Sequence, residues 1–448
     1  MTNTPALAQD ALDSGDTAWM LVSTLLVLMM TVPGLALFYG GLVKKDNVLS
    51  ALIQSLAVAV IVSVIYPVIV YSLAFTEHNM FIGGLDQFML KNVGPDSMVG
   101  SIPESVFVVF QLTFAIITAA LLVGAVADRI KFTSLLVFIP LWVILVYAPI
   151  CHWVWGPGGF LGGIGLEDYE GFMGFGEALD FAGGTVVHIN SGVAGLVAAV
   201  VLGRGMKTRR DASTPNNLIL SVIGTGMLWV GWFGFNAGSA LSAGTSAGFA
   251  MLVTNSAAGM AAVIWMGFEY IHKGKISVQG TLSGVVAGLV AITPAAGFVD
   301  FQGALIIGAL SAVICYLAVT YLKDLLKYDD ALDVFGLHGV GGIVGAILVG
   351  VLANPEIGGA AGALYGDEDR IWAQILSVVV TIGYSGVVTL ILLLVVRTVM
   401  GLRVEPRVER WGLDLAHHGE TIAEWDKSLP KNGSAKPKAK PKAKAKKK

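Results

Sequence analysis

Two histidines, His188 and His338, lie 150 residues apart inside apolar, glycine-rich stretches of the chain. An ionisable group at the centre of a membrane helix costs about 2.5–3.5 kcal/mol on insertion scales, so each of them needs an explanation. One interpretation is two buried histidines that each bond to a neighbour. The other is a pair that shares one proton along a pathway, because imidazole exchanges protons near neutral pH. The pattern favours the proton-sharing pair.

The two histidines belong to matching segments. In each segment an aspartate is followed eight residues later by the histidine, with glycines four and seven residues further on. The sets are Asp180, His188, Gly192 and Gly195, and Asp330, His338, Gly342 and Gly345. Glycines at these positions clear one helix face for close packing. The segments lie in the fifth and the tenth expected spans, so the halves run in opposite directions, which predicts an inverted repeat with its site near the midplane.

Asp180 stands at the expected outer start of its span, in the segment LDFAGG. A carboxylate there could cap the helix N-terminus or stabilise a cation, and both interpretations stay open. A metal site is a poor alternative, because only two histidines converge and no Cys or carboxylate has ligand spacing.

Aromatic residues are dense around the outer segments. They are Phe110, Phe114, Trp153, Trp155, Trp229, Trp232, Phe233 and Phe235. For most of them we expect a belt at the membrane interface. A cluster around a polar notch could instead bind a small cation through ring faces, worth roughly 0.5–2 kcal/mol per ring. Ser239 could then accept a hydrogen bond from that cation.

Composition predicts the elements that must position these residues. Of 448 residues, 55% are hydrophobic and 13% are charged, a balance that cannot cover a water-facing surface of this size. We predict an all-α polytopic membrane protein of eleven spans, some broken by Pro33, Pro67 or Pro294. The spans are roughly 18–42, 48–75, 103–127, 132–152, 183–203, 217–240, 247–271, 279–298, 301–322, 336–354 and 371–400.

Basic residues predict the orientation. They gather in the loops after odd-numbered spans, whereas the opposite side carries only Lys91 and Arg370 and many acids. By the positive-inside rule the N-terminus is outside and the C-terminus is cytoplasmic. No nucleotide-binding motif or catalytic arrangement is evident in the sequence, so we expect neither an ATP-driven pump nor an enzyme, and we expect no cofactor.

Six segments resemble the Amt/MEP/Rh ammonium transporters, most closely the bacterial Amt branch. They are FYGGLVKKDNVLS (38–50), GAVADRI (124–130), DFAGGTVVHINSGVAGL (180–196), GWFGFNAGS (231–239), ITPAAGFV (292–299) and DVFGLHGVGGIVG (333–345). The resemblance covers about residues 17–424. It implies a homotrimer in the bacterial inner membrane, with one pore per subunit. The transporter domain would span 17–400, as inverted five-helix repeats (about 17–203 and 217–354) plus a helix at 371–400. Residues 1–16 would form a periplasmic segment.

The resemblance also implies roles for particular residues. Phe114, Trp155, Phe235 and Ser239 resemble the outer recruitment site and Phe gate, and Asp180 resembles the acid beside it. His188 and His338 resemble the twin histidines of the hydrophobic pore. We therefore expect ammonium, or methylammonium, to bind outside and lose its proton. Ammonia would then cross while the histidines relay the proton, so that transport carries net charge.

The tail at 401–425 contains Gly412–Glu420, which resembles the Amt regulatory tail. The resemblance implies a PII-type regulatory protein as its partner. Residues 426–448 are rich in lysine, and we expect them to be disordered. Anionic lipid is their simplest partner, worth about 1 kcal/mol per basic residue near the surface. Two functional alternatives stay open on the same fold, an ammonium sensor and a neutral ammonia channel.

Overall fold

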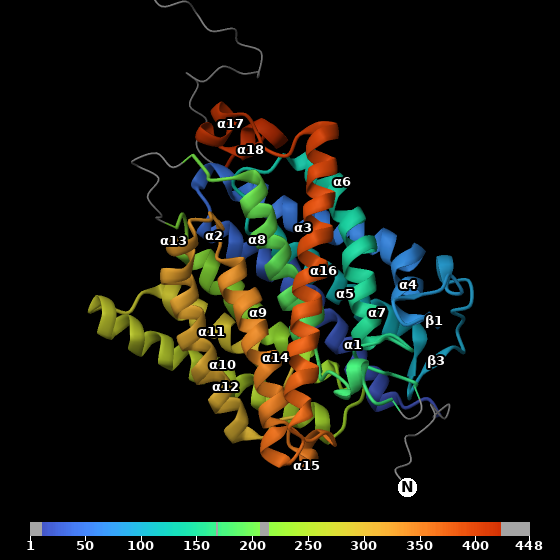
Figure 1. Ribbon diagram of the computed structural model, residues 1–448. Helices are drawn as coiled ribbons and strands as arrows, with labels where there is room; N and C mark the ends of the chain where they lie inside the picture. Colours follow the sequence, from blue (N-terminus) through green and yellow to red (C-terminus); the bar gives the residue numbers. More distant parts are fainter. Residues whose placement is uncertain (1–10, 167–168, 207–214, 423–448) are drawn as a thin grey trace, which may run out of the picture.

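The structure is a computed structural model that describes residues 11–166, 169–206 and 215–422. The expected lysine-rich tail and the start of the N-terminal segment lie outside these residues. The described chain is a bundle of helices that run between two ends (Figure 1). One end carries α17 (Pro406–Trp411) and α18 (Leu413–His418), and we refer to it as the tail end. The other end carries α15 (Pro355–Gly358) and is called the head end.

Helices of the first half occupy the five segments that hydropathy predicted, except that the third expected span, 103–127, overruns its helix, which ends at Val123 before a turn at 124–129. Their continuous stretches are Ser14–Leu42 (α1, η1, α2), Lys45–Phe75 (η2, α3, η3, α4), Glu104–Val123 (α5), Phe132–Trp155 (α6, η5, α7) and Gly184–Leu202 (η7, α8). Between α4 and α5, two short antiparallel hairpins pair β1 (His78–Asn79) with β2 (Ile82–Gly83), and β3 (Met98–Val99) with β4 (Ile102–Pro103).

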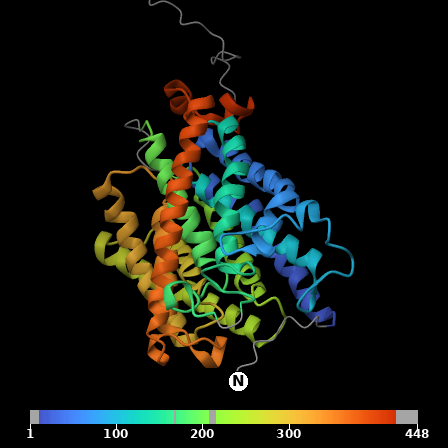
Figure 2. The same ribbon diagram turned by 45° about the vertical axis from the view of Figure 1, so that its right-hand side comes forward.

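Helices of the second half follow the same order. They are α9 (Leu218–Gly238), α10 (Thr245–Lys273), α11 (Val278–Ile292), α12 with η8 and α13 (Phe301–Leu326), η9 with α14 (Phe335–Leu352) and α16 (Asp369–Met400). In the described residues ten helical stretches are long and apolar enough to cross a membrane. Figure 2 shows α16 running nearly the full height of the bundle.

The eighth expected span, 279–298, is wrong in its extent. Helix α11 ends at Ile292, and the chain then turns through residues 293–298. Hydropathy could not mark this end, because the turn is built from apolar residues. Pro294 stands in the turn, and proline cannot donate the backbone hydrogen bond that a continuing helix would need. The Pro294 ring also packs on Gly184, where an added Cβ would lie 2.5 Å from the ring.

Of the two proline-containing breaks predicted inside these spans, the one at Pro33 is a kink, where Val32 has extended backbone angles, and the one at Pro67 is a local π-helical turn. Pro33 lies in η1 (Met30–Leu35) and Pro67 lies in η3 (Tyr66–Val70). Helical hydrogen bonding resumes after each turn, so both segments continue along the bundle. Such turns are common where function requires a helix to deviate from regular geometry.

The matching segments cross at the centre of the bundle. A Cβ on Gly192 would lie 2.2 Å from the amide nitrogen of Gly339, and one on Gly342 would lie 2.9 Å from the carbonyl oxygen of Gly184. Each half therefore places a glycine against the backbone of the other, which confirms the predicted role of glycine in close packing. Both histidines lie in π-helical turns at this crossing, in η7 (Gly184–Ile189) and η9 (Phe335–Gly339).

Candidate functional site

The two histidines meet across the crossing of the halves. Nδ1 of His188 lies 3.3 Å from Nδ1 of His338, and the ring centroids are 5.3 Å apart. Both side chains are buried. A neutral imidazole has one donor nitrogen and one acceptor nitrogen, so this contact requires a proton on one Nδ1 and a lone pair on the other. When both rings are neutral, one therefore carries its proton on Nδ1 and the other on Nε2.

A narrow cavity of about 10 Å³ lies against both imidazoles. That volume is close to the minimum that holds one water-sized molecule. Its other walls are apolar or aromatic, and include Ile117, Leu121 and Val286. Nε2 of His188 has no hydrogen-bond partner among the described residues. A small polar molecule in this cavity would find imidazole nitrogens as its polar neighbours.

Two phenylalanine rings separate the histidines from the head end. Phe114 of α5 and Phe235 of α9 stack face to face, with centroids 4.2 Å apart and planes 17° apart. Both are almost completely buried. Phe235 lies 6.0 Å from the His188 ring, and Trp155 meets Phe114 edge-on at 5.8 Å. The order along this line is therefore Trp155, the stacked pair, and then the two histidines.

Trp155 and Ser239 lie at the head-end side of this line. The indole Nε1 of Trp155 donates to the backbone oxygen of Asp180 at 2.8 Å, which fixes the ring. Ser239 follows Phe235 by one turn, and its hydroxyl donates to the Phe235 carbonyl at 2.8 Å. With its proton committed, the Ser239 oxygen can only accept further hydrogen bonds.

Asp180 has the geometry of a helix cap. Its Oδ1 accepts the amides of Gly183 and Gly184 at 2.9 and 2.6 Å, and its Oδ2 accepts those of Thr185 and Val186 at 2.9 and 3.1 Å. These amides begin the helix that carries His188, and a helix start leaves such groups without intrahelical partners. Of the two interpretations left open by the sequence, the contacts favour the cap.

Trp232 is a residue of the site that the sequence did not single out. It stands among the outer aromatic residues, for most of which the sequence predicts an interfacial belt, and it had no predicted role. In the structure it is buried and stacks on His188 with centroids 5.4 Å apart. Its Nε1 donates to Oγ1 of Thr293 at 2.9 Å, which holds the indole in place. One signal could have found it, because Trp232 precedes Phe235 by three residues and so shares its helix face.

Comparison with known proteins now decides the family. The Ammonium Transporter Family profile matches residues 18–423. The chain belongs to the Ammonium Transporter Family. An ammonium transporter from Aquifex aeolicus is 49% identical over 419 residues, which cover 93% of this chain and 95% of that protein. It follows that this is a multi-pass membrane protein of a transporter family.

Two solved structures share its fold. Saccharomyces cerevisiae Mep2 is 35% identical, with a TM-score of 0.78 and coverage of 90% of this chain and 92% of Mep2. A structure titled Sensor Amt Protein is 28% identical, with a TM-score of 0.81 and coverage of 90% and 98%. Relatives of this family member therefore include proteins named as transporters and one named as a sensor.

Proposed function

We propose that this chain is an electrogenic ammonium transporter in which His188 and His338 relay the proton. The observation that carries the proposal is the 3.3 Å contact between their Nδ1 atoms, buried beside an apolar cavity and behind two stacked phenylalanines. A buried, mutually bonded imidazole pair can accept a proton at one ring and release it from the other.

Desolvation explains why the ion is split. Carrying an unpaired ammonium ion through an apolar passage would cost far more than carrying neutral ammonia. In the proposed mechanism ammonium gives its proton to the histidine pair, ammonia crosses the narrow cavity, and the proton follows through the imidazoles. Each cycle then moves one positive charge. A potassium ion has no proton to give and is excluded.

The outer aromatic cluster would recruit the ion. Trp155 and Phe114 offer ring faces to a cation, and Ser239 offers a hydroxyl oxygen. Asp180 would act through the backbone, because it holds both the Trp155 indole and the start of the His188 helix. Methylammonium would enter the same site, because it keeps the charge and N–H donors.

The proposed architecture has eleven spans with the N-terminus outside and the tail in the cytoplasm, arranged as two inverted five-helix repeats and a final helix. In it α11 is the eighth span, and its 15 residues cover about 22 Å. The reciprocal glycine contacts between η7, α8, η9 and α14 support the repeat. The asymmetry of basic residues supports the orientation. The family resemblance supports a homotrimer in a bacterial inner membrane.

The tail is the proposed regulatory element, with a PII-type protein as its partner. The carboxylate of Asp414 in α18 accepts the amides of Leu49 and Ser50 at 3.1 and 2.7 Å, and so caps α3 (Val48–Ile65). Asn47 accepts the amide of Leu413 at 2.8 Å in return. A partner that pulled on the tail would therefore act on the start of a transmembrane helix. The lysine-rich segment 426–448 would hold anionic lipids.

Two alternatives use the same fold. An ammonium sensor is favoured by the likeness to the Sensor Amt Protein. A channel for neutral ammonia would pass substrate without charge, but it would have no need for the cation-binding aromatics around Trp155.

The test is to pulse purified protein in liposomes on a solid-supported membrane with ammonium, and then with potassium. A transient current for ammonium alone supports selective, charge-carrying transport. If both pulses are silent while ammonium still shifts the melting temperature, the chain is a sensor or a neutral channel.

A further inference from the structure

Gln374 of α16 is a buried side chain whose amide joins three parts of the bundle. Only 1% of the residue is exposed. Its Oε1 accepts the backbone amide of Leu179 at 2.6 Å, and its Nε2 donates to the backbone oxygens of Leu179 and Ala346, each at 2.8 Å. A side-chain amide offers two N–H donors and one carbonyl acceptor, so both N–H groups and the oxygen are used here. Gln374 therefore ties α16 to the segment before Asp180 and to α14.

The Leu179 backbone depends on this amide. In the described part of the chain, its N–H and its carbonyl oxygen have hydrogen bonds to Gln374 and to no other residue. Leu179 is buried, so a missing partner could not be replaced easily. Ala346 differs, because it lies inside α14, where the helix itself uses the carbonyl oxygen. The main effect of losing the Gln374 amide would therefore fall on Leu179.

The next residue, Asp180, connects this anchor to the recruitment cluster. The backbone oxygen of Asp180 accepts the indole N–H of Trp155 at 2.8 Å. Trp155 ends α7 (Ala148–Trp155), so its ring is held by a segment from elsewhere in the chain. The acceptor for the indole lies one peptide unit from the carbonyl that Gln374 holds. The placement of the indole against Phe114, at 5.8 Å, therefore depends on the Leu179 anchor.

Two other parts of the site are held without Gln374. The carboxylate of Asp180 caps amides that follow it by three to six residues, which is a local arrangement. The crossing of the histidine helices rests on the close approach of Gly192 and Gly342 to opposing backbone. Loss of the Gln374 amide should therefore disturb Trp155 more than the histidine pair.

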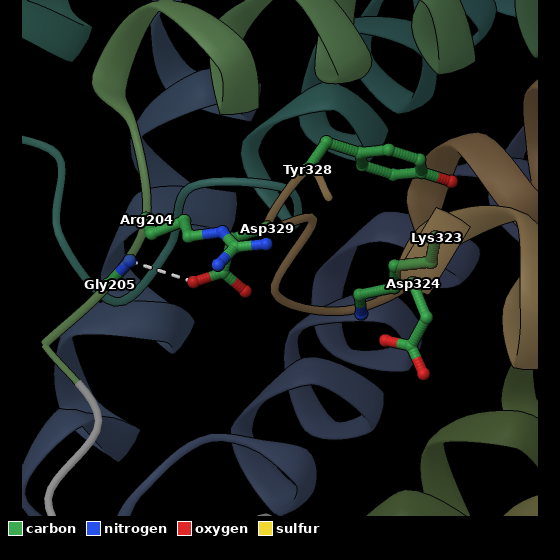
Figure 3. A pocket seen from close by; sticks show the side chains of 6 residues that line it. All are labelled: Arg204, Gly205, Lys323, Asp324, Tyr328 and Asp329. Carbon is green, nitrogen blue, oxygen red and sulfur yellow. Dashed lines mark hydrogen bonds between the residues drawn. The ribbon is translucent and has the colours of Figure 1, made fainter. Parts of the chain in front are cut away.

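The second half of the chain anchors the equivalent residue differently. The counterpart of Leu179 is Asp329, which lies 150 residues later. The backbone oxygen of Asp329 accepts an N–H of Arg129, and its carboxylate accepts the Gly205 amide at 2.7 Å, beside a tail-end pocket of about 420 Å³ (Figure 3). Both of these donors belong to the first half. Because α16 (Asp369–Met400) follows both halves, the Gln374 anchor is a contact that the repeat does not duplicate.

We propose that Gln374 is a positioning residue for ion recruitment, because its amide fixes the Leu179 backbone and thereby the Trp155 indole. Its role in recruitment rests on the proposed function. A ring that is already held in place loses less conformational freedom when a cation binds to its face. Loss of the anchor therefore weakens the binding of ammonium, whereas the histidine pair still relays the proton at saturation.

The first test compares two variants of α16. Gln374→Met keeps the length of the side chain and removes its hydrogen bonds. In the full chain in liposomes on a solid-supported membrane, it should raise the half-saturating ammonium concentration about tenfold and change the maximal current less than about twofold. Thr389→Val is the matched control, because it removes the acceptor of the buried Trp142 indole, which lies at 2.9 Å, and it should leave the half-saturating concentration unchanged.

Two results of this comparison would overturn the proposal. One is an unchanged half-saturating concentration in Gln374→Met, and the other is an equal rise in Thr389→Val. If melting shows that Gln374→Met does not fold, Gln374→Glu replaces it. This variant keeps an acceptor for the Leu179 amide but lacks both N–H donors, so its half-saturating concentration should also rise.

A double variant tests whether Gln374 acts through the indole. In a Trp155→Leu background, Gln374→Met should raise the half-saturating concentration less than about twofold, because the ring that it positions is gone. A full tenfold rise in that background would assign the effect of Gln374→Met to general packing and overturn the positioning role.

Hydrogen–deuterium exchange tests the anchor without transport. The Leu179 amide should exchange faster in Gln374→Met than in the parent, whereas the amide of its counterpart Asp329 should be unchanged. Equal exchange at Leu179 in variant and parent would overturn the anchor. If the parent carries no ammonium current at all, the proposed function fails, and exchange at Leu179 still decides whether Gln374 holds this segment.

Discussion

The ring of Phe114 stacks on the ring of Phe235 with 4.2 Å between centroids, and these two side chains come from different halves of the chain. The stacked pair lies between Trp155 and the histidines, and we propose that it is the barrier that keeps hydrated ions from the apolar cavity. Substituting Phe235 by alanine should let water into this region, because a Phe→Ala change leaves a large cavity.

Phe235→Ala should therefore reduce the ratio of ammonium current to potassium current, measured on a solid-supported membrane. Phe233→Ala on the same helix is the matched control, because Phe233 belongs to none of the ring contacts around His188 and should keep the ratio. Equal ratios in Phe235→Ala and the parent would show that the stack is not the barrier.

Trp232 orients His188 through its stacked indole. Stacked aromatic pairs contribute about 0.5–1.5 kcal/mol beyond buried area, so Trp232→Leu should lower the ammonium current by about 2- to 10-fold. Trp229→Leu, one turn away on α9 and only half-buried, should change it little. Equal losses in the two variants would assign the effect to general packing.

Asp180 supports four backbone amides, whereas Asp300 caps α12 (Phe301–Leu317) through the Gly303 amide at 2.8 Å. Asp180→Ala should destabilise the protein by more than the roughly 0.5–2 kcal/mol typical of a cap, because buried amides lose their acceptors. Asp300→Ala should stay within that range. The melting temperatures of the two variants test this difference. Equal decreases in melting temperature would contradict the larger stabilising role of Asp180.

Asp414 fastens the tail to the start of α3. Asp414→Ala should leave the Leu49 and Ser50 amides without an acceptor, at a cost of about 1–3 kcal/mol. Hydrogen–deuterium exchange should then be faster at both amides and in α18, and unchanged in Glu420→Ala. Unchanged exchange in Asp414→Ala would mean that other contacts hold the tail.

His417 and His418 should make tail docking sensitive to pH. Burial lowers the pKa of both imidazoles, and the ring of His418 packs edge-on against Phe132 at 5.0 Å. The undocked tail therefore takes up protons more readily than the docked tail. Docking should be strongest above the ordinary histidine pKa of about 6.5 and weaken as pH falls below it.

Hydrogen exchange of residues 413–418, corrected for intrinsic rates, should show lower protection at pH 5 than at pH 7.5. The double variant His417→Gln, His418→Gln should lose most of this difference. If the double variant shows the same pH dependence of protection, titratable groups other than these two histidines cause it.

Much of the site could be predicted from sequence because its residues stand in fixed positions on helices. The spacing of aspartate, histidine and glycine in both halves predicted that two helices cross closely, and Gly192 and Gly342 lie at that crossing. Hydropathy predicted most spans, because lipid-facing and core residues are both apolar. The eighth expected span extends past the end of α11 at Ile292 for the same reason, because the turn that follows is also apolar.

Other features depend on how helices rotate and on contacts far apart in the chain. The stack of Trp232 on His188 requires the rotation of α9 about its own axis, which hydropathy alone does not give. The capping of α3 by Asp414 joins residues more than 360 positions apart.

The central claim is that the histidine pair carries the proton, and one measurement tests it most directly. It is the ammonium-evoked current of the double variant His188→Ala, His338→Ala in liposomes, at a protein content matched to the parent and with the fold checked by thermal melting. The account predicts that a folded double variant gives no ammonium current, because no imidazole remains to relay the proton. A current equal to that of the parent would contradict it.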